Sequence, residues 1–300
     1  MGALFRLILK FFYKLTGKKL VYYSLNADVT YCSTAVKSKF GFWYAGDLLD
    51  YQDIAYGIIN NGQVEPGETT LVERIIKELL FKGSCVFYDV GANTGYYGVL
   101  AGFLGKGKAV VYSFEPLSKY RECLNATIFL NRLEDSIRVF SDALSDTEGQ
   151  KNFYIAGSGS SLNSDFLGKE YQATQIVQTA RLDYLFDQEK LLLPDFIKID
   201  VEGGEMDVLK GAMTVIKTSK PILFIEIAQS VNSGKRNFIN INFKETFVIM
   251  ENFGYKAYLS EGGRLDQYNP GQKRDGVAMY LFLHKEKHSW LASTLSVKLD

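Results

Sequence analysis

From residue 85 onward, short apolar segments alternate with longer segments whose apolar residues recur at helical spacing. The short segments are rich in β-branched and aromatic residues, are polar mainly at their last residue, and cover 85–89, 110–114, 136–140, 196–200 and 221–227. Such segments are typical of buried parallel strands. Helices are predicted between or after them, over 96–104, 119–130, 205–216 and 243–252. The alternation predicts an α/β fold with a doubly wound, mostly parallel sheet.

The pattern differs at both ends of the chain. Residues 255–260 and 277–284 are strand-like and have only a turn-rich segment between them, which predicts an antiparallel hairpin at one sheet edge. Residues 67–83 have the spacing of an amphipathic helix that leads into the first strand. Residues 20–65 are aromatic-rich and irregular, and we interpret them as a lid or a dimer-forming extension. We therefore predict an extension over residues 1–65 and one α/β domain over residues 66–300.

The first 20 residues carry basic side chains four positions apart, at Arg6, Lys10, Lys14 and Lys18, beside a broad apolar face. On a helix this spacing gives one basic stripe, so the segment either lies on an anionic membrane surface or packs on the domain or a dimer partner. A cleavable signal peptide fits poorly because the basic residues interrupt the apolar centre. No apolar segment is long enough to predict a membrane-spanning helix.

Composition narrows the function classes. Thirty-four basic residues balance thirty-four acidic ones, so no overall field would attract a nucleic-acid backbone, and we expect no nucleic-acid partner. The three cysteines, Cys32, Cys85 and Cys123, form no CxxC pair and leave one unpaired in any disulfide scheme. This favours packing roles in a reducing compartment. We expect a cytoplasmic protein, held at the inner face of a membrane if residues 1–20 bind lipid.

The stretch FYDVGANTGYYG at 87–98 contains the strongest candidate for binding chemistry. A strand ending in Asp89 is followed by Gly91, Asn93, Gly95 and Gly98, which places a tight turn with free backbone N–H groups in front of a helix. A dinucleotide-binding fingerprint has glycine where Asn93 stands, and a Walker loop would end in Lys-Ser or Lys-Thr. A ligand over the loop is predicted, and a pyrophosphate is disfavoured.

A second acidic position, Glu115, ends the next strand in the sequence SFEP. A carboxylate at this place accepts hydrogen bonds from both hydroxyls of a ribose, as in NAD and other adenosine ligands. Asp89 would be unfavourable beside a pyrophosphate but suits a ligand with ammonium and sulfonium charges. The pair therefore favours S-adenosylmethionine as the cofactor. An NAD-linked oxidoreductase is the alternative.

Several segments together resemble the FkbM-type methyltransferases, in the order found in that family. They are DVGANTGYYG at 89–98, SFEP at 113–116, DALSDTEG at 142–149, SGSSL at 158–162, RLDYL at 181–185 and IKIDVEGGEMDVLKGA at 197–212. The resemblance spans about residues 66–228. It implies a class I, Rossmann-like methyltransferase fold over residues 66–300 and methyl transfer from S-adenosylmethionine to an oxygen, typically a hydroxyl of a sugar or polyketide.

The resemblance also implies roles for individual residues. The amino-acid part of the cofactor would be held by Asp89, Gly91, Ala92, Asn93 and Gly95. The ribose would contact Glu115 and Pro116, and the adenine would lie by Asp142 and Ala143. Asp200 and Glu202 end the fourth strand, at the sheet edge where ligands bind in open α/β folds.

Methyl transfer to a hydroxyl requires a base that removes the proton. The only two histidines, His284 and His288, lie in or after the last predicted strand, so Asp200 and Glu202 are the candidate catalytic residues. Crowding of the two would raise the pKa of one toward a useful value, although Glu202 would alternatively cap the following helix. With Glu226 they would suit Mg²⁺, but nothing in the sequence fixes three ligands at one point, and no metal is predicted.

The acceptor is the least determined feature. Aromatic residues in the extension suit sugar rings, and the serine-rich segment at 158–161 either closes over the site or is a plain surface loop. A small-molecule or glycan acceptor and a homo-oligomer are our expectations. A non-catalytic binding protein that keeps the methyltransferase fold is a further alternative.

Overall fold

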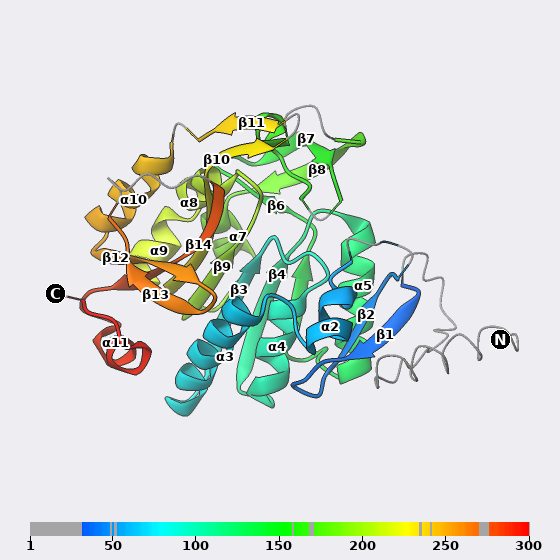
Figure 1. Ribbon diagram of the computed structural model, residues 1–300, viewed down its shortest axis with the longest axis horizontal. Helices are drawn as coiled ribbons and strands as arrows, with labels where there is room; N and C mark the ends of the chain where they lie inside the picture. Colours follow the sequence, from blue (N-terminus) through cyan, green and yellow to red (C-terminus); the bar gives the residue numbers. More distant parts are fainter. Residues whose placement is uncertain are drawn as a thin grey trace, which may run out of the picture.

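The computed structural model describes residues 32–299 except 49, 51–52, 158, 168–170, 234–235, 241 and 270–275. Nine strands of this part form one sheet, whose main path is β13-β12-β14-β10-β9-β3-β4-β5, with β11 paired to β10 (Figure 1). The strands are β3 Cys85–Val90, β4 Ala109–Phe114, β5 Ile137–Phe140, β9 Phe196–Ile199, β10 Ile222–Ser233, β11 Arg236–Ile239, β12 Tyr255–Glu261, β13 Arg264–Gln267 and β14 Gly276–His284. Neighbours from β10 to β5 run parallel, and β14, β12 and β13 are antiparallel.

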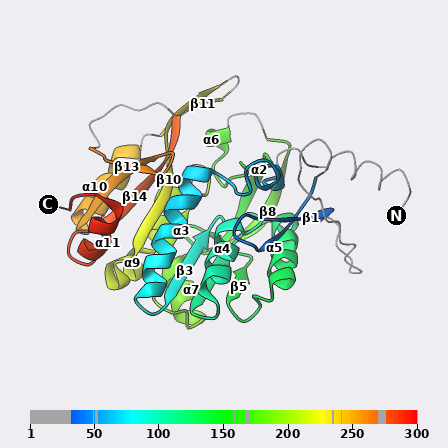
Figure 2. The ribbon, with the colours of Figure 1, turned by 60° about the horizontal axis from the view of Figure 1, so that its bottom comes forward.

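Helices cover both faces of this sheet (Figure 2). One face is covered by α3 Pro66–Phe81, α4 Tyr96–Gly105, α5 Ser118–Asn131 and α11 Ser289–Leu295, and the other by α7 Leu182–Gln188, α8 Glu205–Gly211, α9 Met213–Ser219 and α10 Phe243–Asn252. The predicted class I, doubly wound architecture is confirmed.

The two hydrophobic cores follow from the alternation of side chains along the central strands. Phe87 packs on the face of α3 and α4, whereas its neighbour Tyr88 packs on the face of α7 to α10, and both are fully buried. Each such side chain contributes about 1.5–3 kcal/mol of burial free energy. Strands buried on both faces need apolar residues at every position, which is why the segments read as continuous apolar runs.

The C-terminal strands differ from the predicted hairpin in one respect. β12 and β14 do pair antiparallel, but β14 lies between β10 and β12, and the added strand β13 forms the outer edge. β14 is almost wholly apolar from Tyr280 to Leu283, and these four residues are buried. The inner place therefore suits β14, while β13, with exposed Arg264 and Asp266, suits the edge.

Two regions contain more regular structure than the sequence indicated. A three-stranded sheet, β6 Ala143–Leu144, β8 Ala173–Ala180 and β7 Gly149–Ile155, was not predicted. The prediction of an irregular 20–65 segment was wrong for its described part, which forms the hairpin β1 Thr34–Lys37 and β2 Trp43–Gly46 and the helix α2 Ala55–Asn61. The predicted helix at 205–216 is divided into α8 and α9 at Ala212.

The predicted amphipathic helix at 1–20, with its membrane contact, lies outside the described residues. Among the helices that the structure does describe, none has the length and hydropathy required to cross a membrane.

Candidate active site

The candidate site lies at the carboxyl ends of β3, β4 and β9, beside the adjacent part of β10. In parallel strands the carboxyl ends meet at one sheet edge, and ligands of open α/β folds bind there. The glycine loop follows β3, Glu115 follows β4, Asp200 follows β9, and Glu226 lies within β10. A cavity of about 430 Å³ opens between them, a size within the range of small-molecule sites.

The glycine loop is held tightly against its neighbours. The N–H groups of Gly91 and Ala92 both donate to the carbonyl oxygen of Phe114, each over 3.0 Å. Gly91 has a φ of +74°, and a Cβ atom on it would lie 1.8 Å from the backbone oxygen of Asp200. Glycine is therefore required at position 91 by both conformation and space.

Asn93 takes the position of the central glycine in a dinucleotide fingerprint and has a φ of +52°. Asparagine tolerates this left-handed conformation better than other residues with a side chain, because its amide oxygen bonds locally. Here that oxygen accepts a hydrogen bond from the N–H of Thr94 over 2.8 Å. The N–H of Asn93 donates to Glu115 Oε2 over 2.9 Å, which joins the loop to the end of β4.

Glu115 points toward the glycine loop, as a ribose-binding carboxylate must. Its second oxygen, Oε1, accepts a hydrogen bond from the N–H of Leu117 over 2.8 Å, so the carboxylate is fixed at both ends. Burial raises the pKa of Glu115 to about 7, against the lowering effect of the hydrogen bonds from Leu117 and Asn93. Each oxygen keeps lone-pair capacity for a ligand hydroxyl.

Asp89 is almost completely buried, with an exposed fraction of 1 %. Its Oδ2 accepts a hydrogen bond from the N–H of Gly98 over 2.9 Å, in the first turn of α4. This satisfies one of the helix N–H groups that lack an intrahelical partner. Burial raises the pKa of Asp89 to about 6, although the charge of Lys198 opposes the shift. Asp89 thus supports the loop as well as lining the cavity.

Lys198, which the sequence analysis did not select, connects the two halves of the site. Its Nζ lies 2.6 Å from Asp200 Oδ2 and 5.0 Å from the centroid of the Tyr97 ring, and its side chain is only 4 % exposed. Burial lowers the pKa of Lys198, but the charges of Asp200 and Asp89 raise it by more, so the lysine stays protonated. A buried cation therefore sits between the Asp89 and Asp200 carboxylates.

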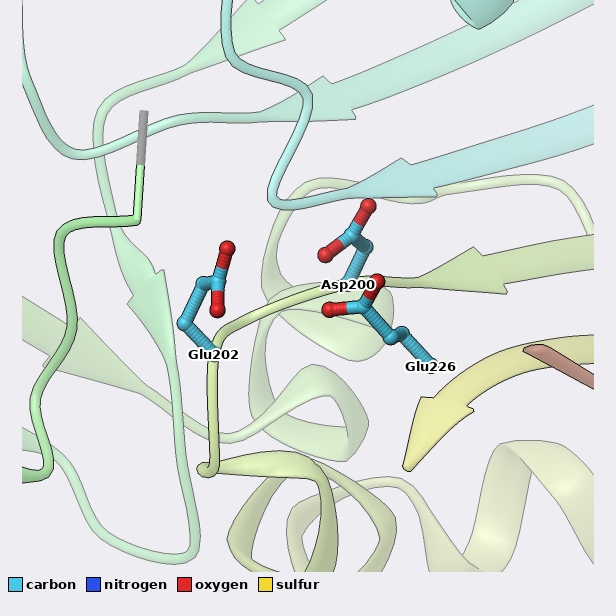
Figure 3. Close-up of side chains that lie close together, drawn as sticks. All are labelled: Asp200, Glu202 and Glu226. Carbon is cyan, nitrogen blue, oxygen red and sulfur yellow. The ribbon is translucent and has the colours of Figure 1, made fainter. Parts of the chain in front are cut away.

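Asp200, Glu202 and Glu226, which also line the cavity, form a carboxylate cluster (Figure 3). One oxygen of each lies within 4.8 Å of the others. Burial raises the pKa of Glu226 well above its ordinary value, and the charges of Asp200 and Glu202 raise it further. The sequence predicted that crowding would raise the pKa of Asp200 or Glu202. In the structure, the pKa that crowding raises is that of a third carboxylate, Glu226 of β10. Three carboxylate oxygens at this spacing could also hold Mg²⁺, which prefers oxygen ligands.

The predicted site residues can be compared directly with the cavity lining. Those that line it are Asp89, Gly91, Ala92, Asn93, Glu115, Pro116, Asp142, Ala143, Asp200 and Glu202. Gly95 does not: it precedes α4 with a φ of +80°, and a Cβ on it would lie 2.0 Å from Leu124 Cδ1. Its requirement for glycine is explained by packing on α5.

Glu202 does not occupy the N-cap position of the following helix, because Gly204 is the N-cap residue of α8. Glu202 instead has a φ of +56°, and its backbone oxygen accepts a hydrogen bond from Ser161 Oγ over 2.6 Å. Ser160 lines the cavity, and Ser158 lies outside the described residues. The serine-rich segment therefore contacts the site through Ser160 and Ser161.

The extension also reaches the site. Ile54, Val64 and Glu65 line the cavity, and Glu65 Oε2 accepts a hydrogen bond from the Tyr97 hydroxyl over 2.7 Å.

Among the site residues that the sequence did not predict, Lys198 had one signal in the sequence: it is a cation inside the otherwise apolar strand segment IKID. Glu65 and Tyr97 had none, because their proximity depends on how α3 packs on α4.

One prediction concerns Glu205, which is buried and whose Oε1 accepts a hydrogen bond from the N–H of Gly203 over 2.8 Å. Burial raises its pKa to about 7, so between pH 4.5 and 7 the folded protein holds a proton that the unfolded chain has released. The free energy of unfolding should therefore fall by about 2 kcal/mol between pH 5 and 7.5 from this group.

Glu205→Gln keeps the hydrogen-bond acceptor and removes the titration. Urea denaturation at both pH values should show a smaller decrease in the free energy of unfolding for the variant than for the wild type. An identical pH dependence in the two proteins would contradict the assignment.

The fold is that of a class I methyltransferase: a doubly wound, mostly parallel sheet with a glycine loop after β3 and the acid Glu115 beside it after β4. The model of the methyltransferase FkbM domain matches residues 89–257, more than half of the chain. The chain belongs to the FkbM methyltransferase family, whose cofactor is S-adenosylmethionine, and this decides against the NAD-linked alternative.

Two curated proteins and one solved structure illustrate the relationship. The 2-O-methyltransferase NoeI of Sinorhizobium fredii is 31 % identical over 175 residues, which cover 51 % of this chain and 68 % of NoeI. The hexuronic acid methyltransferase AglP of Haloferax volcanii is 27 % identical over 169 residues, or 55 % of this chain and 64 % of AglP. The crystal structure of methyltransferase FkbM from Methylobacillus flagellatus is 17 % identical with a TM-score of 0.43, covering 76 % of this chain and 60 % of that one.

Proposed function

We propose that this protein is an S-adenosylmethionine-dependent O-methyltransferase that acts on a hydroxyl of a saccharide or a related small molecule. The observation that carries the proposal is the cavity itself. Its lining includes Glu115, which is fixed against the glycine loop, and the carboxylate cluster of Asp200, Glu202 and Glu226. A nucleoside binder and a group suited to proton removal are thus joined in one space.

The residues present fit the cofactor. Gly91 keeps its side of the cavity free of a Cβ atom, and Glu115 offers lone pairs to two ribose hydroxyls. Asp142 and Ala143 line the cavity where an adenine would lie, and Asp89 contributes negative charge for an ammonium group. When bound, S-adenosylmethionine supplies an electrophilic methyl group.

The carboxylate cluster would bind and deprotonate the acceptor hydroxyl. Asp200 is ion-paired with Lys198, so we assign the removal of the hydroxyl proton to Glu202 and Glu226. A general base works best when its pKa lies near the working pH, and the raised pKa of Glu226 is a shift in that direction. Asp200 would then orient the hydroxyl through a hydrogen bond.

The relatives support an oxygen on a sugar as the methyl acceptor. The name of NoeI specifies 2-O-methylation, and the name of AglP specifies a hexuronic acid. The lining includes Tyr96, Tyr97 and Tyr120, whose rings and hydroxyls suit a sugar face and its edge.

Calorimetry with S-adenosylhomocysteine tests the cofactor half of the proposal. The wild type should bind, and Glu115→Ala should bind about tenfold more weakly or worse, because hydrogen bonds to a charged group are worth about 1.5–3 kcal/mol each. Glu134→Ala removes an exposed carboxylate from the turn between α5 and β5, at the amino end of β5 and outside the cavity lining, and is the matched control. Wild-type protein that does not bind, or equal affinities for all three proteins, would contradict it.

The acceptor half is tested by release of S-adenosylhomocysteine in the presence of methyl hexosides and hexuronates. Product formation with at least one sugar, lost in Glu202→Gln, is the expected result. Cofactor binding without methyl transfer to any saccharide, or to any component of an extract of the host cell, would favour the non-catalytic alternative.

A further inference from the structure

Two of the three cysteines meet across the junction between the extension and the α/β domain. Cys32 Sγ lies 2.8 Å from Cys123 Sγ, although 91 positions separate them in the sequence. Cys32 precedes β1 and is partly exposed, whereas Cys123 is a buried residue of α5. Neither belongs to a disulfide in the structure. From the sequence, all three cysteines were assigned packing roles, and nothing in it shows that two of the thiols face one another.

The surroundings hold this pair in register. Three hydrogen bonds join β2 of the hairpin to α5 on the C-terminal side of Cys123. The N–H of Trp43 donates to Asn131 Oδ1 over 2.8 Å, and Asn131 Nδ2 donates to the backbone oxygen of Trp43 over 2.6 Å. The N–H of Ala45 donates to Thr127 Oγ1 over 2.9 Å. Thr127 and Asn131 lie one and two helical turns beyond Cys123. The thiol contact is thus part of a defined interface.

We propose that Cys32 and Cys123 form a disulfide site that covalently fastens the N-terminal extension to α5. A disulfide needs an S–S distance of about 2.05 Å, so closure requires a relative shift of only about 0.8 Å. Cys85 belongs to the first core strand, β3, and is fully buried at a separate place. It is not a competing partner.

The chemistry requires an oxidant, and a peroxide is sufficient. The partly exposed Cys32 thiol loses its proton to solvent, and the thiolate attacks one peroxide oxygen. The O–O bond breaks, Cys32 becomes a sulfenic acid, and the hydroxide that leaves takes up a proton to give water. The Cys123 sulfur then attacks that sulfenic sulfur, forming the S–S bond and releasing a second water. Two thiols are oxidised by two electrons, and one peroxide is reduced. The order follows from access, because Cys123 is buried. The hydrogen bond with Cys32 and, after it, burial also raise the pKa of the Cys123 thiol.

The bond would act on the segment that supports the cofactor loop. The Tyr44 hydroxyl in β2 donates a buried hydrogen bond to Thr94 Oγ1, inside the glycine loop. Asp50, also in the extension, pairs with Lys119 at the start of α5 over 2.8 Å. A covalent link at Cys32 would hold these supports in place when the hairpin would otherwise detach. The inference does not depend on the identity of the methyl acceptor.

The experiment treats the purified chain with a small excess of hydrogen peroxide and maps non-reduced tryptic peptides. We expect one cross-linked peptide that joins Cys32 to Cys123, and a decrease from three titratable thiols to one under denaturing conditions. The Tm should rise by roughly 5–10 °C, because the bond closes a long loop in the unfolded chain, and dithiothreitol should reverse the rise. Trypsin should cut more slowly at the exposed Lys37 and Lys39.

Cys32→Ser should show neither the cross-link nor the rise in Tm, while Cys85→Ala is the matched control and should still show both. Calorimetry with S-adenosylhomocysteine on the reduced protein separates this result from failure of the proposed function, since neither Cys32 nor Cys123 lines the cavity. Three free thiols after treatment, a cross-link that includes Cys85, or a bond between two chains would each overturn the proposal.

Discussion

Gly91→Ala is expected to reduce the kcat/KM for methyl transfer by at least about 100-fold and to weaken binding of S-adenosylhomocysteine to a similar extent. The added Cβ would lie 1.8 Å from the backbone oxygen of Asp200 and 3.2 Å from Val201 Cγ1, in a residue whose φ is +74°. The backbone of Asp200 cannot move aside as a side chain can, because its N–H donates a hydrogen bond to the backbone oxygen of Val90 over 3.0 Å. The loop must therefore move away from β9.

That movement separates the two halves of the site. A shift of about 1 Å in a positioning element is enough to lose about two orders of magnitude in rate. Steady-state kinetics and calorimetry measure the effect, and circular dichroism establishes that the variant is folded. The expected decrease in the free energy of unfolding, about 2–3 kcal/mol, leaves a typical domain mostly folded.

Gly107→Ala is the matched control. Gly107 also has a positive φ, +86°, but nothing lies within 4 Å of a Cβ built on it. This variant carries the conformational strain, about 1–2 kcal/mol, without the overlap. Its kcat/KM should stay within about twofold of the wild type. Equal losses in the two variants would show that strain alone, and not the contact with Asp200, makes glycine necessary at position 91.

The local parts of the site were predictable from sequence because their geometry is encoded locally. A tight turn after an apolar strand places Gly91 and Asn93, and a carboxylate one βα unit later must end the adjacent strand. The structure places Glu115 within hydrogen-bonding distance of the loop, as this reasoning requires. Chain order and strand periodicity were sufficient for this half of the site.

The acidic half depends on strand register, which the sequence does not state. Ile225 of β10 pairs with Ile199 of β9, so Glu226 follows one residue later at the level of Asp200. A shift by one residue would turn Glu226 to the other face of the sheet. From the sequence, Glu226 was therefore considered only as one conceivable metal ligand. Its position in the carboxylate cluster is set by the register of β10 on β9.

The prediction that the extension is irregular was wrong for its described part because tertiary contacts, and not its own sequence pattern, order this part of the chain. The strands β1 and β2 have four residues each, too short for a clear period, and a two-stranded hairpin alone is marginal in water. The hairpin becomes ordered by docking on α5 and on the glycine loop, with Phe42 and Tyr44 fully buried. Nothing in residues 32–65 considered alone specifies that partner.

The charges of the site form one connected system. Burial favours the protonated forms of Asp89 and Glu115, with pKa values raised to about 6 and 7, and Lys198 is the buried cation that opposes the shift at Asp89. The cation also pairs with Asp200, the first residue of the acidic cluster. The loop half and the acidic half therefore share one counter-ion, and its removal should affect both.

Lys198→Met is expected to lower the free energy of unfolding by about 3–5 kcal/mol at pH 8, the usual result of leaving one partner of a buried ion pair uncompensated. Methionine keeps most of the stem volume, so the loss reports charge more than packing. Without the cation, which lowers the pKa of Asp89, that pKa should rise further in the folded state. Protonation of Asp89 then restores stability below its pKa, so the loss should be smaller at pH 5 than at pH 8.

Urea denaturation at the two pH values measures this. Lys77→Met is the matched control, because Lys77 forms an i,i+4 pair with Glu73 on α3 and is 59 % exposed. Its effect should stay below about 0.5 kcal/mol and be independent of pH over this range. The double variant Lys198→Met/Asp200→Asn should recover part of the loss, since one of the two unpaired carboxylates is gone. A single-variant loss that is the same at both pH values, with no recovery in the double variant, would mean that Lys198 acts through packing and not as the shared counter-ion of Asp89 and Asp200.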